Sequence, residues 1–341
     1  MSDRVAVFGA GSWGTALAIQ LARSGHQVRL WARSPGQVDE MERTRCNSKY
    51  LPGIELPSTI EPTADLDAAL AGCERILVAV PSAAFAEIVE RIFERMAARG
   101  DQGRAARCGL AWATKGFEPG TGRLLSRRAR ELVGGDVPLA CVTGPSFAGE
   151  VARGLPTAVT VGASDPAFGK AWVALLHGNS FRAYYTADLI GVQLGGAVKN
   201  VMAIACGMTD GLELGENTRA ALITRGLAEM MRLGVAMGAK ERTLTGLAGL
   251  GDLVLTCTGP ASRNRSFGLA LGQGASLEQA RAQVHQVVEG VDAAEEVMRA
   301  AAEAGVEMPI SEQVHGILHR GWSAERGVKV LMEREPRAEA E

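Results

Sequence analysis

The sequence predicts an α/β fold in which a doubly wound parallel sheet is followed by an all-helical domain. Two observations carry this prediction. In the first half of the chain, short apolar runs alternate with stretches of helical periodicity, the pattern of βαβ units and a parallel sheet. After about Asp188 the strand-like runs disappear and long helical segments follow. We therefore expect a sheet domain over residues 1–189, a helical domain over 190–335 and a frayed polar tail at 336–341.

Each predicted element of the sheet domain lies between turn residues such as Pro81-Ser82 and Gly134-Gly135. The predicted strands cover residues 5–8, 28–31, 76–80, 110–113, 139–142, 158–161 and 181–185. The predicted helices between them cover residues 13–23, 85–96, 122–132 and 167–177.

The predicted helices of the second domain are separated by glycine-rich breaks. Three glycines between residues 207 and 217 predict an interruption after its first helix. The helices are expected over residues 190–206, 218–237, 277–285, 293–304 and 313–319.

Length and charge narrow the function classes. At 341 residues the chain is long enough for two domains of ordinary size. Its 36 Lys and Arg residues nearly balance 38 Asp and Glu residues, and only 5% of residues are aromatic. This composition disfavours a nucleic-acid partner, and the absence of a polybasic run disfavours a membrane surface. The glycine-rich helical domain is compatible with a homodimer.

Cysteine spacing and hydropathy predict a cytoplasmic protein. The six cysteines are scattered without a CxxC pair, which is typical of small buried side chains in a reducing compartment. The longest uncharged run, residues 5–22, contains glycine, serine, threonine and glutamine. It is too polar for a membrane span or a signal sequence, so we expect no stable membrane insertion.

A glycine motif directly follows the first predicted strand and opens the first predicted helix. Gly9-Ala10-Gly11-Ser12-Trp13-Gly14 matches the dinucleotide fingerprint GxGxxG in the required context. Gly9 permits the tight turn, Gly11 lets the backbone approach a pyrophosphate, and Gly14 allows the helix and strand to pack closely. The helix N-terminus offers free N–H groups to the phosphates. The motif predicts a Rossmann-like dinucleotide-binding domain; the alternative is a glycine turn without a ligand.

The end of the second predicted strand bears on the choice of cofactor. In NAD-selective domains an acidic residue there bonds the ribose 2′-hydroxyl, but here none occurs before Asp39, which lies inside the next helix. Arg33 stands in its place and suits a 2′-phosphate. The sequence therefore favours NADPH and is compatible with NADH. The alternative is that Arg33 is a solvent-exposed side chain that contacts no cofactor.

Two lysines are candidates for acid–base chemistry. Lys115 follows the strand 110–113, at the carboxyl end of a parallel strand, where ligands bind in open α/β sheets. Lys199 lies in Gly195-Gly196-Ala197-Val198-Lys199-Asn200, among small and apolar residues of an expected buried helix. Burial lowers the pKa of an amine from ~10.4 towards neutrality, which suits proton transfer to a carbonyl oxygen during hydride transfer. The alternative for either is a surface lysine whose ammonium reaches water.

Three further segments carry polar groups whose role the pattern leaves open. Thr143-Gly144-Pro145-Ser146 starts a helix with Ser146 as N-cap, or else presents N–H groups to a ligand. Asp252 lies in a glycine-rich, apolar stretch, where a turn cap is the commoner role. Ser262-Arg263-Asn264-Arg265 is a dense set of donors that suits a phosphate, and a surface loop is its alternative.

Neither a metal site nor a hydrolytic nucleophile is expected. His315 and His319 have a helical spacing that can bind metal, but no third ligand is near, and a solvated helix face is the simpler interpretation. The sequence contains neither a GxSxG elbow nor a GxxxxGKS/T phosphate loop.

Taken in order along the chain, these segments resemble a known family, the bacterial NAD(P)-dependent glycerol-3-phosphate dehydrogenases. The resemblance covers nearly the whole sequence and rests on the order and spacing of its segments. These are GAGSWGTALA at 9–18, NSKYLPG at 47–53, ATKG at 113–116, TGPSFA at 143–148, GAVKN at 196–200, NTRAALITRG at 217–226, GLGD at 249–252 and SRN at 262–264.

The resemblance implies a fold similar to that of 6-phosphogluconate dehydrogenase, with a helical domain that binds the substrate and carries the catalytic residue. It implies reduction of dihydroxyacetone phosphate to sn-glycerol 3-phosphate with NADPH or NADH, for glycerophospholipid synthesis. Lys199 would be the acid–base, and Lys115 would contact both cofactor and substrate. Arg33 and Ser146 stand where the family also has histidine and threonine, which leaves the cofactor preference open.

The resemblance and the glycine motif together name the expected site residues. The implied substrate-binding residues are Lys115, Gly144, Ser146, Lys199, Asp252, Ser262, Arg263 and Asn264. The implied cofactor-binding residues are Gly9, Gly11, Ser12, Trp13, Gly14, Arg33, Tyr50, Lys115, Ala148, Arg263, Val287 and Glu289.

Two other functions are compatible with parts of the sequence. A β-hydroxyacid dehydrogenase of the 6-phosphogluconate type also carries a catalytic lysine on a helix after two glycines. The segments 47–53 and 262–264 argue against it. A non-catalytic NADPH-binding sensor would keep the glycine motif but has no need of Lys115, Lys199 and Asp252 together.

Overall fold

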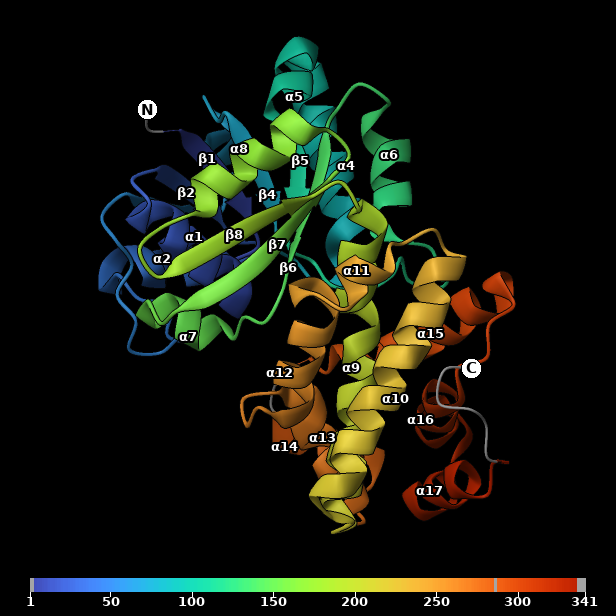
Figure 1. Ribbon diagram of the computed structural model, residues 1–341. Helices are drawn as coiled ribbons and strands as arrows, with labels where there is room; N and C mark the ends of the chain where they lie inside the picture. Colours follow the sequence, from blue (N-terminus) through green and yellow to red (C-terminus); the bar gives the residue numbers. More distant parts are fainter. Residues whose placement is uncertain (1–2, 285–286, 336–341) are drawn as a thin grey trace.

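The computed structural model (Figure 1) describes residues 3–284 and 287–335 of the chain. Its N-terminal part is built on an eight-stranded sheet with the strand order β3-β2-β1-β4-β5-β6-β7-β8. The strands are β1 (Arg4–Phe8), β2 (Gln27–Trp31), β3 (Ile60–Thr63), β4 (Arg75–Val78), β5 (Leu110–Trp112), β6 (Leu139–Thr143), β7 (Thr157–Ala163) and β8 (Phe181–Thr186).

Both faces of this sheet are buried along β1, as in a doubly wound fold, whereas β8 at the edge alternates buried and exposed residues. Along β1, Val5 and Val7 face a core shared with the first helix, while Ala6 and Phe8 face the core on the other side. Runs of consecutive apolar residues are what such doubly covered strands require, because neither face meets water. The predicted α/β class is therefore confirmed, and most predicted strands match to within two residues.

Two features of the sheet differ from the prediction. β7 pairs antiparallel to β6 and parallel to β8, so the last two strands run against the rest and the sheet is not wholly parallel. β3 was not predicted, because the segment Ile60–Thr63 is short and polar and contains a proline. Such residues suit its place at the edge of the sheet.

The helices of the first part cover both faces of the sheet. The helix predicted at 122–132 begins later, at Leu125, because residues 117–124 form a hairpin closed by a bridge between Phe117 and Leu124. We call this segment the 117–124 hairpin. The helices are α1 (Ser12–Arg23), α2 (Pro35–Thr44), α3 (Leu66–Leu70), α4 (Ser82–Ala98), α5 (Gln102–Cys108), α6 (Leu125–Val133), α7 (Ala148–Arg153) and α8 (Pro166–Leu176).

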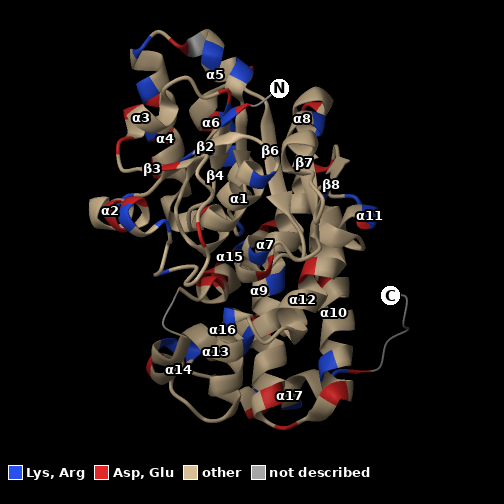
Figure 2. Ribbon diagram, turned by 90° about the vertical axis from the view of Figure 1, so that its left-hand side faces the viewer, with Lys and Arg blue, Asp and Glu red and all other residues tan. Residues whose placement is uncertain are grey.

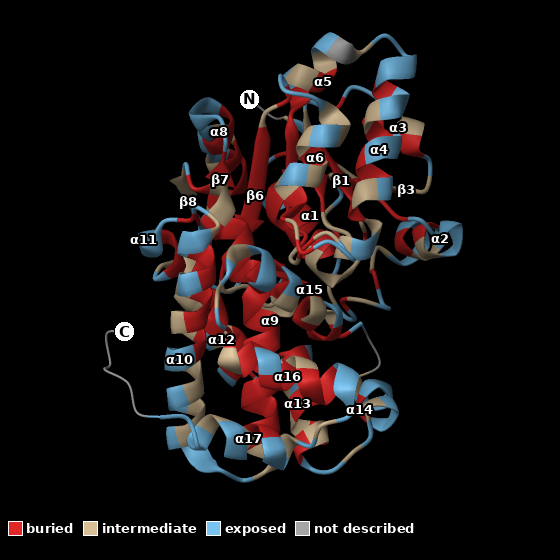
Figure 3. Cartoon of the chain, turned by 90° about the vertical axis from the view of Figure 1, so that its right-hand side faces the viewer, coloured by how far each residue is buried: buried red, intermediate tan, exposed pale blue. Residues whose placement is uncertain are grey.

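The second part is helical and is arranged around one long central helix, α9 (Leu189–Gly211). Figure 3 shows α9 as buried almost throughout, between outer helices that carry exposed residues. The others are α10 (Gly215–Ala236), α11 (Glu241–Leu244), the π-helical turn η1 (Leu247–Gly251), α12 (Asp252–Thr258), α13 (Arg263–Gly272), α14 (Leu277–Val284), α15 (Glu289–Ala304), α16 (Pro309–Arg320) and α17 (Ala324–Met332). His285, which ends one predicted helix, and the tail after residue 335 lie outside the described residues.

Length and composition alone would allow α9 to cross a membrane. Its mean hydropathy is 1.5, but 89% of the relevant window is buried inside the protein, as expected for a core helix. Acidic and basic residues are interspersed on the helices visible in Figure 2.

Glycines let α9 and α13 approach each other to backbone contact. A Cβ atom at Gly207 would overlap the carbonyl oxygen of Arg265, and one at Gly268 would overlap that of Ile204. Gly211 and Gly272 are equally crowded by the opposite backbone. The predicted interruption between residues 207 and 217 is confirmed, but it is confined to residues 212–214, because these glycines serve helix packing and α9 continues to Gly211. They also pack within the chain, so they do not supply a surface for the expected homodimer.

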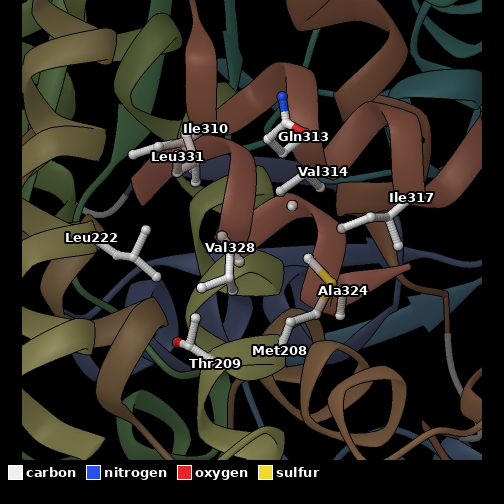
Figure 4. A pocket seen from close by; sticks show the side chains of 12 residues that line it. Met208, Thr209, Leu222, Ile310, Gln313, Val314, Ile317, Ala324, Val328 and Leu331 are labelled. Carbon is white, nitrogen blue, oxygen red and sulfur yellow. The ribbon is translucent and has the colours of Figure 1, made fainter. Parts of the chain in front are cut away.

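A small apolar cavity of about 30 Å³ lies between α9, α10, α16 and α17 (Figure 4). Met208, Leu222, Val314 and Val328 are among its lining residues, and none of the lining residues carries a charge. It has room for about one or two water molecules. Met208 is about 13 Å along α9 from Lys199, so this cavity is separate from the candidate chemistry.

We predict that Gly207→Ala lowers the free energy of unfolding by about 2–3 kcal/mol, because the added methyl group forces α9 and α13 apart. Urea denaturation of the full chain measures the loss. Gly36→Ala in α2 is the matched control, since a Cβ there meets no atom within 4 Å. It should leave stability unchanged or raise it by up to about 1 kcal/mol. Equal effects at the two positions would contradict the packing role of Gly207.

Candidate active site

The first β–α turn has the geometry that a dinucleotide fingerprint needs. Gly9 has a φ of +116°, and a Cβ there would stand 2.5 Å from the carbonyl oxygen of Ala79. A Cβ at Gly14 would overlap the Gly9 carbonyl oxygen, so α1 can pack on the turn only with glycine at this position. Both observations agree with the predicted roles of these glycines.

The turn leaves room and donors for a phosphate group. A Cβ at Gly11 would meet no atom within 4 Å, so the backbone there is open to approach. No side chain caps α1, whose first turn contains no acidic residue. The turn is braced from behind by Asn47, which donates 2.9 and 2.8 Å hydrogen bonds to the Ala10 carbonyl and to Thr15 Oγ1. A pyrophosphate fits this arrangement of N–H groups and helix dipole.

The other predicted cofactor residues surround the same turn or lie on the helical part. Ser12 Oγ donates a 3.0 Å bond to the Tyr50 carbonyl, which ties the segment 47–53 to α1. Trp13 carries a buried indole Nε1 for which no hydrogen-bond partner is found among the described residues. Arg33 is exposed just beyond β2, before the Ser34 cap of α2.

Ala148 begins α7, which packs against α1. On the helical part, Val287 is 57% exposed and Glu289 begins α15.

Lys115, Lys199 and Asp252 meet in one buried cluster. Lys199 Nζ lies 2.5 Å from Asp252 Oδ1, and Lys115 Nζ lies 2.6 Å from Asp252 Oδ2. The three side chains come from α9, from the segment after β5 and from the first residue of α12. Thr256 Oγ1 accepts a 2.9 Å hydrogen bond from Lys199 Nζ. Neither lysine is a surface residue and Asp252 is not an isolated turn cap, so those alternatives are wrong.

Burial and charge act differently on the two lysines. Burial lowers the pKa of Lys199 to about 8; Asp252 opposes this effect, while the positive charge of Lys115 adds to it. Burial also acts against the charged form of Lys115, but the attraction of Asp252 outweighs it and raises the pKa of Lys115 above its usual range. Burial disfavours the Asp252 carboxylate, yet the two ammonium groups lower its pKa. The cluster thus holds one permanent cation, one anion and one amine that can exchange a proton near neutrality.

The two glycines before Lys199 explain how α9 reaches this position. A Cβ at Gly195 would overlap the Ala248 carbonyl of η1, and one at Gly196 would stand 2.8 Å from Thr143 Oγ1 and 3.3 Å from Lys115 Cγ. α9 therefore passes directly between the end of β6 and the turn that carries Asp252. Side chains at either position would push the lysine away from its partners.

A second polar network lies one residue further along α9. Asn264 Nδ2 donates a 2.9 Å bond to Asn200 Oδ1, and Asn264 Oδ1 accepts a 2.9 Å bond from Gly290 N. Asn200 Nδ2 in turn donates to Glu289 Oε2 at 3.4 Å. This network fixes the start of α13 and the start of α15 beside the Lys199 cluster.

The remaining predicted substrate residues lie on two loops that border these networks. Ser262 is the N-cap of α13 and accepts a 3.3 Å bond from Arg265 N, with the exposed Arg263 next to it. This segment is therefore a helix start, not a loop. Gly144 has a φ of +149° and packs against β7. Ser146 does not cap α7, whose N-cap is Phe147; its hydroxyl donates to the Gly144 carbonyl at 2.8 Å.

The sequence assigned no site role to Thr256, Asn200 or Asn47, although the last two lie in segments that carry the family resemblance. Thr256 contacts Lys199, Asn200 contacts Asn264, and Asn47 contacts the glycine motif at Ala10. Thr256 follows Asp252 by one helical turn, a spacing that brings it beside the same lysine. The ring centroids of His315 and His319 lie 4.9 Å apart. No group of three or more His, Cys, Asp or Glu residues that could hold a metal is found in the described part of the chain.

A glycine turn at the carboxyl ends of parallel strands beside a buried lysine–carboxylate cluster defines an NAD(P)-dependent oxidoreductase. Two family models match the chain: the N-terminal region of NAD-dependent glycerol-3-phosphate dehydrogenase over residues 4–169 and its C-terminal region over residues 188–329. The chain belongs to the NAD-dependent glycerol-3-phosphate dehydrogenase family.

Relatives and solved structures agree over the whole length. A glycerol-3-phosphate dehydrogenase (NAD(P)+) of Xanthomonas oryzae pv. oryzae is 55% identical, with 99% of this chain and 98% of the relative covered. One of Stenotrophomonas maltophilia is 53% identical, with coverage of 99% and 97%. The crystal structure of glycerol-3-phosphate dehydrogenase from Coxiella burnetii has a TM-score of 0.91 at 47% identity and covers 98% of this chain and 99% of that one.

More distant structures share the fold alone. A ketopantoate reductase from Ralstonia eutropha has a TM-score of 0.60 at 16% identity, covering 95% of this chain and 99% of that one. The match to the two family models decides against the β-hydroxyacid dehydrogenase and the non-catalytic sensor. It also supports the use of NADH or NADPH as cofactor.

We predict that Asp252→Asn destabilises the protein by about 3–5 kcal/mol at pH 7, because two buried lysines lose their anion. Their pKa values in the folded state should then fall below those of the unfolded chain, which binds more protons. Stability of the variant should therefore rise with pH towards 10. Urea denaturation at pH 7 and 9.5 measures this change, with Asp39→Asn on exposed α2 as control. A loss of equal size at both pH values would contradict the electrostatic cause.

Proposed function

We propose that the protein reduces dihydroxyacetone phosphate to sn-glycerol 3-phosphate with NADPH or NADH and catalyses the reverse oxidation, with Lys199 as acid–base. The observation that carries this proposal is the lysine of lowered pKa, held at 2.5 Å from a buried carboxylate beside the dinucleotide turn. Full-length relatives named for the same reaction support it.

The proposed reaction transfers one hydride and one proton. When bound, the nicotinamide supplies the hydride to the carbonyl carbon or receives it in reverse. Lys199 donates a proton from Nζ to the carbonyl oxygen during reduction and accepts the hydroxyl proton during oxidation. Asp252 and Thr256 hold Nζ in place, and the permanent charge of Lys115 stabilises negative charge on the oxygen.

The phosphate of the substrate is assigned to the start of α13. Ser262, Arg263 and Asn264 stand at this helix N-terminus, where N–H groups and the helix dipole favour an anion. Asn264 is connected to Asn200, the neighbour of Lys199, so an anion at this end would be held in a fixed relation to the acid–base. Gly144 and Ser146 are assigned to the opposite wall of the substrate site.

The dinucleotide is assigned to the turn at Gly9, Gly11 and Gly14. Arg33 beyond β2 is the proposed partner of a 2′-phosphate, and no acidic residue stands between it and Asp39. Ser12, Trp13, Tyr50, Lys115, Ala148, Arg263, Val287 and Glu289 complete the proposed contacts.

The wider role follows from the same family membership. We assign residues 1–189 to dinucleotide binding and residues 190–335 to substrate binding and catalysis, with the 117–124 hairpin crossing between them. We propose that the enzyme is cytoplasmic and supplies glycerophospholipid synthesis, without nucleic-acid partners and without stable membrane insertion; a homodimer stays a prediction from the sequence.

The proposed reaction predicts rapid oxidation of NADPH by the purified protein with dihydroxyacetone phosphate, followed by the loss of absorbance at 340 nm. Unphosphorylated dihydroxyacetone should react far more slowly, because it lacks the anion. Lys199→Ala should lower kcat by at least about 10³-fold and leave NADPH binding nearly intact. The wild-type rate of glycerol 3-phosphate oxidation should rise with pH through about 8, as Lys199 loses its proton.

Either of two results would overturn this assignment. A folded, NADPH-binding protein without turnover would exclude the reaction. Substantial turnover by Lys199→Ala would place the acid–base elsewhere.

Arg33→Asp should shift the preference from NADPH towards NADH, because the carboxylate repels a 2′-phosphate and accepts a bond from a 2′-hydroxyl. The ratio of kcat/KM for the two cofactors measures the shift, and about tenfold or more is expected. Arg43→Asp, at an exposed position of the following helix α2, is the control for charge alone. An unchanged ratio in Arg33→Asp would remove Arg33 from the 2′-phosphate site.

A further inference from the structure

The 117–124 hairpin begins two residues after Lys115 and packs into the helical part of the protein. Glu118 N donates a 2.8 Å bond to the Arg123 carbonyl, which closes the hairpin. Phe117 and Leu124 are buried in the same hydrophobic cluster as Val297 and Ala300 of α15. The hairpin therefore anchors the segment that carries Lys115 in the hydrophobic core of the helical part.

Glu296 of α15 holds the tip of this hairpin with both carboxylate oxygens. Its Oε1 accepts a 2.7 Å bond from Gly120 N, and its Oε2 accepts a 2.7 Å bond from Gly122 N. Hydrogen bonds to an ionised acceptor at this distance are among the stronger ones in proteins. Glu296 is only 7% exposed, so water does not replace these bonds at low cost.

The backbone of the hairpin tip is shaped for this contact. Gly120 and Gly122 have φ values of +77° and +69°, which favour glycine. A Cβ at Gly122 would stand 2.8 Å from Ala300 N, so the hairpin lies directly on α15. The two hydrogen bonds to Glu296 and the close contact at Gly122 therefore allow only one placement of the hairpin on α15.

The same helix also faces the site. Its first residue, Glu289, accepts from Asn200 and raises the pKa of Lys115 through its negative charge. Glu296 follows about two turns later on the same side of the helix. α15 thus bonds to Asn200 of α9 beside the site and to the tip of the hairpin that follows Lys115.

We infer that Glu296 is a positioning residue for the reaction: by clamping Gly120 and Gly122 it keeps the Lys115 ammonium on Asp252 Oδ2. Glu296 does not touch the reacting atoms and acts through the hairpin. This inference rests on the proposed function, in which Lys115 assists Lys199.

Release of the hairpin should change the titration of Lys199. The charged groups around its amine are Asp252 of α12 and Lys115, with Glu289 of α15 acting on Lys115; the Cys257 thiol of α12 also lies near. Lys115 lowers the pKa of Lys199 through its positive charge. If Lys115 withdraws, the pKa of Lys199 should rise, and the pH profiles of both reaction directions should move to higher pH.

The test is Glu296→Gln, which keeps the size of the side chain but turns an NH₂ group towards one glycine N–H. We expect kcat to fall about tenfold or more, since small displacements of a positioned group cost that much. The inflection in the pH profile of kcat should move to higher pH. Hydrogen exchange of a peptide spanning residues 117–124 should become faster.

Glu295→Gln is the matched control, because it removes the same charge from the neighbouring, half-exposed position of α15. It should behave like the wild type in all these measurements. Glu296→Asp, which keeps the carboxylate but draws it back by one methylene, should give an intermediate kcat and inflection. If Glu296→Gln does not fold, Glu296→Asp carries the test.

The outcomes separate this inference from the proposed function. An inactive wild type would remove the proposed function itself. An active wild type with a Glu296 variant whose kcat and pH inflection equal those of Glu295→Gln would overturn the positioning role, even if its thermal stability were lower.

Discussion

The carboxylate of Asp252 is the charge on which the site depends, because it is buried and shared between two ammonium groups. A buried carboxylate is costly unless it is paired and hydrogen-bonded, and here both oxygens are used. One partner comes from the segment after β5 and the other from the middle of α9. The pairing therefore joins the sheet to the helical part at the point where chemistry is proposed. Gly195 and Gly249 support it, since backbone packs against each of them and holds the turn that presents Asp252.

The two lysines differ although they share one carboxylate. Lys199 lies inside a helix surrounded by packed side chains, and desolvation lowers its pKa. Lys115 has Glu289 as a further negative neighbour, and its pKa is raised. Environments that separate the pKa values of neighbouring groups are a common basis for assigning acid–base roles. In this site the separation gives one lysine for proton transfer and one for steady positive charge.

Much of the fold could be predicted from the sequence because most strands and helices form where the local hydrophobic pattern indicates them. The glycine motif follows β1 as expected, and the small residues around Lys199 correctly indicated a buried helix. The direction of β7 could not be predicted, because its alternation of buried and half-buried residues is the same whichever way the strand runs. Gly207 was misread for a related reason: glycine marks a helix break and a close helix contact equally well.

The site was predictable only where a residue type carries its own chemistry. Lysines and an aspartate in apolar segments attract notice, whereas Thr256 and Asn47 are common residues whose partners are known only after folding. Glu296 is the clearest case. In the sequence it is one of several acidic residues on an amphipathic helix, and its contact with Gly120 and Gly122 spans about half of the chain.

The placement of the 117–124 hairpin also bears on how the protein folds during synthesis. The apolar side chains of Phe117 and Leu124 belong to a core whose α15 is made much later. At ribosomal rates of about 5–20 residues per second, roughly 10–35 s pass between the two segments. During that interval the sheet can form around β5 while the hairpin still lacks its core. The nascent chain therefore exposes the side chains of Phe117 and Leu124 beside its future active site until the helical half is made.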